Sequence, residues 1–127
     1  MTSKFLDYKG ENIKIAIVDS GLSNHKNINL QSIVYKKSLA YKDGDFIINN
    51  KIYDEHGHGT AVTSIINKYI PKAKLYIFKI LDNNNRCSGK VLVKILENIL
   101  NMDIDIINLS LGTEDFRYIN ELIFSRI

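Results

Sequence analysis

The stretch Ile-Ala-Ile-Val-Asp-Ser-Gly at residues 15–21 decides the fold of this chain. Its first four residues are apolar and mostly β-branched, which predicts a strand, and an unbroken apolar run is typical of a parallel strand covered on both faces. The acid, serine and glycine that follow predict a turn. The sequence therefore places Asp19 at the carboxyl end of a central strand, where ligands gather in parallel sheets.

Strands and helices alternate along the rest of the chain. Apolar residues recur at helical spacing in residues 59–69 and 91–100, and Pro71 ends the first of these two helices. The remaining stretches predict a weaker strand at 32–39, a loop or small hairpin at 43–52, a strand at 74–81, an exposed loop at 82–89, a buried strand at 104–109 and a helix at 116–124. This alternation predicts an α/β fold with a mostly parallel sheet flanked by helices.

The composition narrows the class of protein. A length of 127 residues suits a single domain over 1–127, and 45% hydrophobic with 24% charged residues is the balance of a globular chain. The net charge of +3 comes with scattered lysines, so we expect no nucleic-acid partner. Cys87 is the one cysteine, which excludes an internal disulfide and fits a reducing compartment. We find no signal-type or membrane-spanning stretch, and therefore expect a cytoplasmic protein with no membrane partner.

A second informative stretch is His-Gly-His-Gly-Thr-Ala-Val at residues 56–62, where the first predicted helix begins. Gly57 and Gly59 flank His58 and allow the backbone to approach closely on both sides. A neutral imidazole with one nitrogen held by a carboxylate can take a proton at the other nitrogen. Asp19 and His58 therefore have the character of two of the three members of a charge-relay site.

Other interpretations of these residues stay open at this point. Asp19 can be an ordinary turn acid, and strand-terminal acids also bind metals and phosphates. Asp54, His56 and His58 together suggest a metal site, but no cysteine or further histidine cluster completes a ligand shell. No glycine-rich phosphate loop supports a nucleotide site. We therefore expect neither a metal nor another cofactor.

Two further side chains are candidate nucleophiles. Ser110 lies in Asn-Leu-Ser-Leu-Gly at residues 108–112, which ends a predicted strand, but no Gly-x-Ser-x-Gly turn surrounds it. The same stretch is either a plain strand exit or a backbone edge that pairs with an extended peptide. Cys87 lies in a polar loop without signs of an activated environment, so we expect an inert thiol.

Four motifs in their order and spacing resemble the subtilisin-like serine proteases, the subtilases. These motifs are residues 17–21, 58–62, 71–81 and 106–112, and the resemblance covers about the whole chain after Asn12. It implies a three-layer α/β/α fold of the subtilisin-like type. It also implies that Asp19 orients and supports His58, and that His58 acts as general base and then as acid for the leaving amine.

The resemblance also implies how a peptide or protein substrate would bind. Ser110, Leu111 and Gly112 match the segment that offers its backbone to the substrate as an added strand. Ser88 and Gly89 match a small-residue segment that borders the other side of the substrate.

The chain departs from the family pattern in several respects, of which the missing nucleophile and oxyanion asparagine matter most. The family nucleophile lies in a Gly-Thr-Ser-Met-Ala stretch beyond the Ser-Leu-Gly strand, and the oxyanion asparagine lies between them. The 127 residues contain neither stretch. We therefore expect a fold truncated before the serine-bearing half and no useful hydrolysis by this polypeptide alone.

Two accounts of this departure compete. The chain is a fragment or one half of a split protease whose serine lies in a second chain, or it is a non-catalytic peptide-binding module that uses the strand edge. In either case a truncated parallel sheet exposes the strand at 104–109, so we expect marginal stability or association through that edge.

Overall fold

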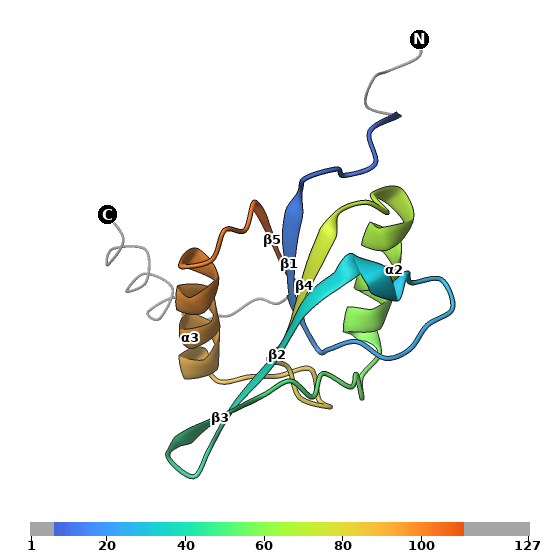
Figure 1. Cartoon of the computed structure of the whole chain (residues 1–127). Helices are drawn as coiled ribbons and strands as arrows, with labels where there is room; N and C mark the ends of the chain where they lie inside the picture. The colour runs from blue at the N-terminus through green and yellow to red at the C-terminus, as the bar shows by residue number, and fades with distance from the viewer. Residues whose placement is uncertain (1–6, 111–127) are drawn as a thin grey trace.

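The computed structural model describes residues 7–110, which form a five-stranded sheet with one α-helix on each face (Figure 1). The strands lie in the order β3-β2-β4-β1-β5. β4 pairs in parallel with both β1 and β2, β5 pairs in parallel with β1, and only β3 runs antiparallel to its neighbour β2. The bounds of the elements are β1 (Lys14–Asp19), β2 (Ile33–Lys42), β3 (Asp45–Asn49), α2 (His58–Tyr69), β4 (Lys74–Lys79), α3 (Gly89–Leu100) and β5 (Ile106–Leu109), with a short 3-10 helix at Leu30–Ser32.

Alternate side chains of the central strands bury against different helices. In β1, Ile15 and Ile17 belong to the core under α2, whereas Ala16 and Val18 belong to the core under α3. Because successive side chains of a strand point to opposite faces, an unbroken apolar run serves both layers at once. The predicted α/β fold with helices on both faces of a mostly parallel sheet is therefore confirmed.

Local chemistry explains where α2 ends and where α3 begins. α2 ends at Tyr69, two residues before Pro71, whose ring removes a backbone donor and disfavours continuation of a helix. α3 begins two residues before the predicted start, because the Ser88 hydroxyl accepts a hydrogen bond from the Val91 amide (3.3 Å) and caps it. Neither of these helices of the described region is both long and apolar enough to span a bilayer.

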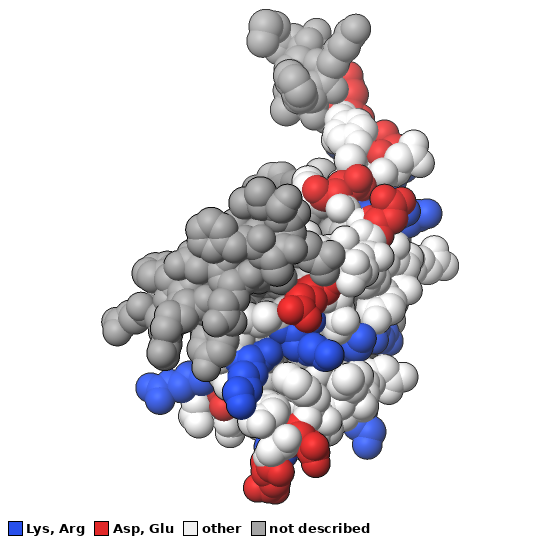
Figure 2. Space-filling model, turned by 90° about the vertical axis from the view of Figure 1, so that its left-hand side faces the viewer, with Lys and Arg blue, Asp and Glu red and all other residues white. Residues whose placement is uncertain are grey.

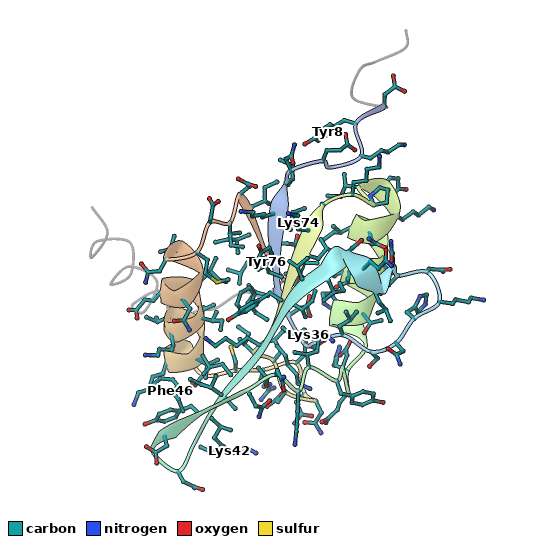
Figure 3. All side chains as sticks on the ribbon, in the orientation of Figure 1. Tyr8, Lys36, Lys42, Phe46, Lys74 and Tyr76 are labelled. Carbon is teal, nitrogen blue, oxygen red and sulfur yellow. The ribbon has the colours of Figure 1, made fainter. Side chains whose placement is uncertain are left out.

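The segment predicted as a loop or small hairpin is a hairpin. β2 runs on to Lys42 and returns as β3, with Asp43 (φ 54°) and Gly44 (φ 83°) at the turn. Positive φ at both central residues is the geometry that joins two twisted strands through a two-residue turn. Phe46 of the hairpin lies beside α3 (Figure 3), with the Lys94 ammonium 5.6 Å from the centre of its ring.

One prediction about the sheet needs a correction of its bounds. The strand predicted at 104–109, which truncation was expected to expose, begins two residues later, as β5 covers Ile106–Leu109 and Ile106 is 51% exposed. Within residues 7–110, β5 pairs with β1 alone and forms an edge of the sheet, so one of its sides has no neighbouring strand. The predicted helix at 116–124 lies outside the described residues.

Charged residues of both signs lie on one face of the molecule. On the face shown in Figure 2, Lys and Arg side chains lie among acidic and uncharged ones. This face therefore carries charges of mixed sign.

Candidate functional site

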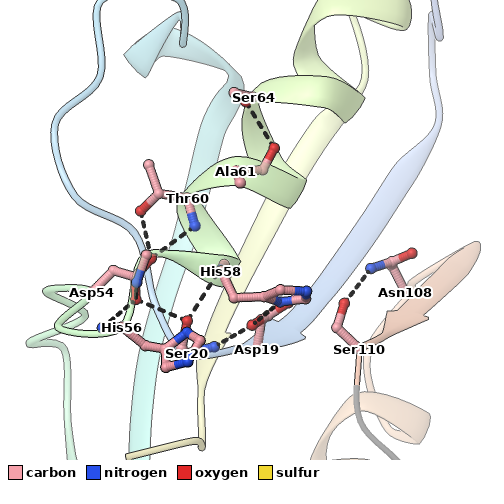
Figure 4. A network of polar contacts seen from close by, with 12 residues as sticks. Asp19, Ser20, Asp54, His56, His58, Thr60, Ala61, Ser64, Asn108 and Ser110 are labelled. Carbon is pink, nitrogen blue, oxygen red and sulfur yellow. Dashed lines mark hydrogen bonds and ion pairs between the residues drawn. The ribbon is translucent and has the colours of Figure 1, made fainter. Parts of the chain in front are cut away.

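Asp19 and His58 meet at the carboxyl edge of the parallel strands (Figure 4). Asp19 is the last residue of β1 and is 1% exposed, whereas His58 is the first residue of α2. The Nδ1 atom of His58 lies 3.0 Å from each carboxylate oxygen of Asp19. The amide of Ser20 donates a further hydrogen bond of 2.7 Å to Asp19 Oδ1. The fold thus joins two residues that are 39 positions apart in sequence.

The two glycines beside His58 serve different purposes. Gly57 precedes α2 with φ +99° and open space around its α-carbon, so its role is conformational. Gly59 has no room for a side chain, because a Cβ atom there would collide with the backbone of Gly21. The start of α2 therefore packs directly on the turn after β1, which holds the imidazole beside Asp19. The predicted close approach of backbone is found at Gly59 and not at Gly57.

The geometry of this pair suits proton transfer. When Nδ1–H of His58 donates to the carboxylate, Nε2 carries the lone pair and can accept a proton. The His58 side chain is 44% exposed, so a reacting group can approach it, while Asp19 is shielded from water. A buried carboxylate in this position orients the ring and stabilises the imidazolium that forms. The arrangement can therefore take a proton from a donor and return it.

Asp54 is a buried acid that sequence reasoning considered only as a metal ligand. Burial by itself would raise the pKa of Asp54, but hydrogen bonds from Thr60, Gly57 and Ser20 outweigh it and lower the pKa to about 2. Its carboxylate oxygens are thus engaged by protein donors. Within residues 7–110 no group of three or more His, Cys, Asp or Glu residues is placed to hold a metal ion. The sequence did contain a sign of this role for Asp54. It lies a few residues before the start of the predicted helix, where an acid can accept hydrogen bonds from free backbone amides.

Ser110 lies at the same edge of the sheet as Asp19 (Figure 4). Its amide donates to the carbonyl of Val18 (3.3 Å), and its hydroxyl accepts from the side-chain amide of Asn108 (2.9 Å). No hydrogen bond joins Ser110 to His58 within residues 7–110, and the structure brings Ser110 near Asp19 through the pairing of β5 with β1. Leu111 and Gly112, the other two predicted substrate-binding residues of this segment, lie outside the described residues.

Ser88 and Gly89, predicted to border a substrate, lie at the start of α3. Ser88 caps this helix and Gly89 is its first residue. Ser88 and Cys87 also line a cavity of about 150 Å³, together with residues at the ends of β2 and β4. Burial, with a smaller contribution from the charge of Asp82, raises the pKa of the Cys87 thiol to about 11. The thiol is therefore protonated at neutral pH, in agreement with the inert cysteine predicted from sequence.

Comparisons with known proteins agree with one another. Residues 10–123 match the model of the subtilase family of peptidases. The chain is 34% identical over 113 residues to the minor extracellular protease Epr of Bacillus subtilis, with 82% of this chain covered. It is 31% identical over 118 residues to subtilisin E of the same species, with 83% of this chain covered. Among solved structures, a lanthipeptide protease superimposes with a TM-score of 0.68 at 25% identity over 94% of this chain.

The chain spans only part of these relatives. The matched region makes up 16% of the Epr protease, 28% of subtilisin E and 35% of the lanthipeptide protease chain. The comparisons therefore concern the region that holds Asp19 and His58.

Proposed function

This chain belongs to the subtilase family, and we propose that it supplies the aspartate and histidine of an Asp–His–Ser endopeptidase site. The observation that carries the proposal is the contact of His58 Nδ1 with both carboxylate oxygens of the buried Asp19, at 3.0 Å each. The match to subtilisins over most of the chain supports the same assignment.

In the proposed reaction, a serine hydroxyl contributed by a segment outside these 127 residues attacks the carbonyl carbon of a peptide bond. His58 Nε2 takes the hydroxyl proton as the new carbon–oxygen bond forms, and then gives it to the leaving amine as the carbon–nitrogen bond breaks. Asp19 stays ionised and stabilises the imidazolium. A water molecule, activated by His58 in the same way, then releases the acyl group from the serine.

The proposed substrate is a peptide or protein in extended form. The edge of β5 supports this proposal, because within residues 7–110 it has no strand on its outer side and its exit at Ser110 lies beside the Asp19 end of β1. Ser110 with Leu111 and Gly112 would pair with the substrate backbone on this side. Ser88 and Gly89 would border the substrate on the other side, near the cavity that Ser88 helps to line.

We further propose that these 127 residues hydrolyse no peptide by themselves, because they contain no Gly-Thr-Ser-Met-Ala stretch. They would work as one part of a protease whose serine lies outside these residues. The same β5 edge supports a second candidate function, a peptide-binding module without catalysis. The presence of Cys87 as the one cysteine supports our proposal of a reducing, cytoplasmic compartment, which cell fractionation can check.

The test begins with the source DNA beyond codon 127, read in all frames for a Gly-Thr-Ser-Met-Ala-like stretch. The polypeptide that contains the stretch is expressed together with this chain, and casein hydrolysis is measured. We expect hydrolysis by the pair, none by this chain alone, and a loss of at least about a thousand-fold in His58→Ala.

The matched control is His25→Ala, which removes an exposed histidine from a loop that does not contact Asp19 and should leave hydrolysis unchanged. Hydrolysis that survives in His58→Ala would contradict the proposal. A source genome without any serine-bearing partner would favour peptide binding, measured with extended peptides on the chain alone.

A further inference from the structure

Asp54 carries a second buried carboxylate next to the Asp19–His58 pair. It is 5% exposed, and both of its oxygens accept hydrogen bonds. Oδ1 accepts from the Ser20 hydroxyl (2.8 Å) and from the amides of Gly57 (2.8 Å) and His56 (3.2 Å). Oδ2 accepts from the amide (2.9 Å) and the hydroxyl (2.6 Å) of Thr60. Five donors from two segments of the chain thus converge on one side chain.

These donors belong to the backbone segments that carry His58 and Asp19, and Figure 4 shows Asp54 and Ser20 beside that pair. Gly57 precedes His58 and is held by Asp54 directly. Gly59 follows His58, and its amide donates to the Ser20 hydroxyl (2.9 Å), which in turn donates to Asp54. Ser20 follows Asp19 and donates its own amide to the Asp19 carboxylate. The backbone around His58 and the backbone after Asp19 are therefore tied to the same carboxylate.

We propose that Asp54 is a positioning residue, which acts through Ser20 and the start of α2 to hold the His58 ring in hydrogen-bonding register with Asp19. This inference rests on the proposed function, because it concerns the same Asp19–His58 pair. Asp54 touches neither imidazole nor reacting atoms, so its effect passes through backbone placement. An ionised carboxylate suits this task because it accepts hydrogen bonds at both oxygens and donates none.

An asparagine at position 54 cannot take over this role. Its amide group offers one accepting oxygen and one donating nitrogen, so the NH₂ would face the donors either of Thr60 or of Ser20 and Gly57. Either the two Thr60 donors, or the donors of Ser20, His56 and Gly57, would lose their acceptor, and the start of α2 would shift relative to the turn after β1.

The experiment records ¹⁵N and ¹H NMR spectra of the imidazole groups in the folded 127-residue chain. Its three histidines are assigned with His25→Gln and His56→Gln. In the wild type we expect His58 as the Nδ1–H tautomer, with a slowly exchanging Nδ1 proton. In Asp54→Asn we expect loss of that proton signal and a shift of the neutral ring toward the other tautomer.

The matched control is Asn67→Ala, at the other end of the same helix. Asn67 is also buried, accepts from the Asn29 amide (2.9 Å) and donates to the Ser32 hydroxyl (3.1 Å), so its loss weakens packing of α2 without touching His58. Its His58 signals should match the wild type. A purely structural role of Asp54 would predict the same changes in both variants.

Ser20→Ala keeps the test decisive if Asp54→Asn does not fold. It removes only the hydroxyl between Asp54 and Gly59, and we expect faster exchange of the His58 Nδ1 proton. If Asp54→Asn and Ser20→Ala, wherever they fold, both keep the wild-type His58 signals, the inference about Asp54 is overturned while the proposed function is untouched. Absence of the Nδ1–H signature in the wild-type chain would overturn the proposed Asp19–His58 pair, and the inference with it.

Discussion

At the scale of single residues, burial separates the roles of the two acids at the site. Asp19 is 1% exposed and contacts an imidazole, whereas Asp54 is 5% exposed and contacts only amides and hydroxyls. A carboxylate that accepts several hydrogen bonds is favoured in its charged form, which explains the lowered pKa of Asp54. The charge of Asp54 therefore contributes to the stability of the fold as well as to the proposed positioning of His58.

This argument predicts how stability depends on pH. The pKa of Asp54 falls from 3.8 to about 2 on folding, which corresponds to about 2 kcal/mol of stability above pH 4. Because the folded pKa is the lower one, this stability is present above the unfolded pKa and is lost as pH falls from about 4 to about 2. Urea unfolding from pH 5 to 2 should show a steeper loss in the wild type than in Asp54→Asn.

The control for this prediction is Asp103→Asn. Asp103 pairs with Lys14 (2.9 Å), but its side chain is 93% exposed, so its contribution is small. A pH dependence of Asp54→Asn that matches the wild type would refute the assigned role of the charge.

At the scale of secondary-structure elements, the close contact between the start of α2 and the turn after β1 places the site. The contact is possible because Gly59 has no side chain, and a Cβ there would meet the backbone of Gly21 and Ser20. Helix α3 begins differently, because the Ser88 hydroxyl caps its first turn by accepting a hydrogen bond from a backbone amide. Gly59 thus allows the close approach of α2 to the turn after β1, whereas Ser88 determines where α3 begins.

We predict that Gly59→Ala is strongly destabilising, by roughly 1–3 kcal/mol or more, because the backbone of the turn must move. Gly57→Ala should cost only about 1 kcal/mol, since its φ is +99° but open space surrounds it. Urea unfolding of both variants measures the difference. Equal costs at the two positions would show that the close contact does not form in solution.

At the scale of the whole molecule, the two outer strands of the sheet differ in what lies beside them. β3 belongs to a hairpin whose Phe46 ring lies near Lys94 of α3, whereas β5 pairs in parallel with β1. Ile106, Ile107 and Leu109 of β5 are 51%, 37% and 37% exposed. An exposed apolar edge of this kind favours pairing with another strand.

We therefore predict that the isolated chain self-associates through β5. Sedimentation velocity over a range of concentrations should show association in the wild type and a marked reduction in Ile106→Lys. The control is Ile65→Lys on α2, where the native side chain is 57% exposed but lies away from the sheet edges. A monomeric wild type, or an equal effect of both lysines, would contradict association through this edge.

The sequence by itself determined the order of the elements and the two residues at the site. Strands and helices followed from local periodicity, because burial on two faces or on one stripe leaves a distinct pattern of apolar residues. Asp19 and His58 were identifiable because each lies in a short motif at the end of a strand or the start of a helix.

Only the tertiary structure decided the features that depend on distant contacts. The strand order β3-β2-β4-β1-β5, which places β1 between β4 and β5, is not specified by local pattern. The link between Asp54 and Ser20 joins side chains 34 positions apart, so no periodicity or spacing predicts it. Element identity is encoded in neighbouring residues, whereas strand order and polar networks depend on which segments come together in space.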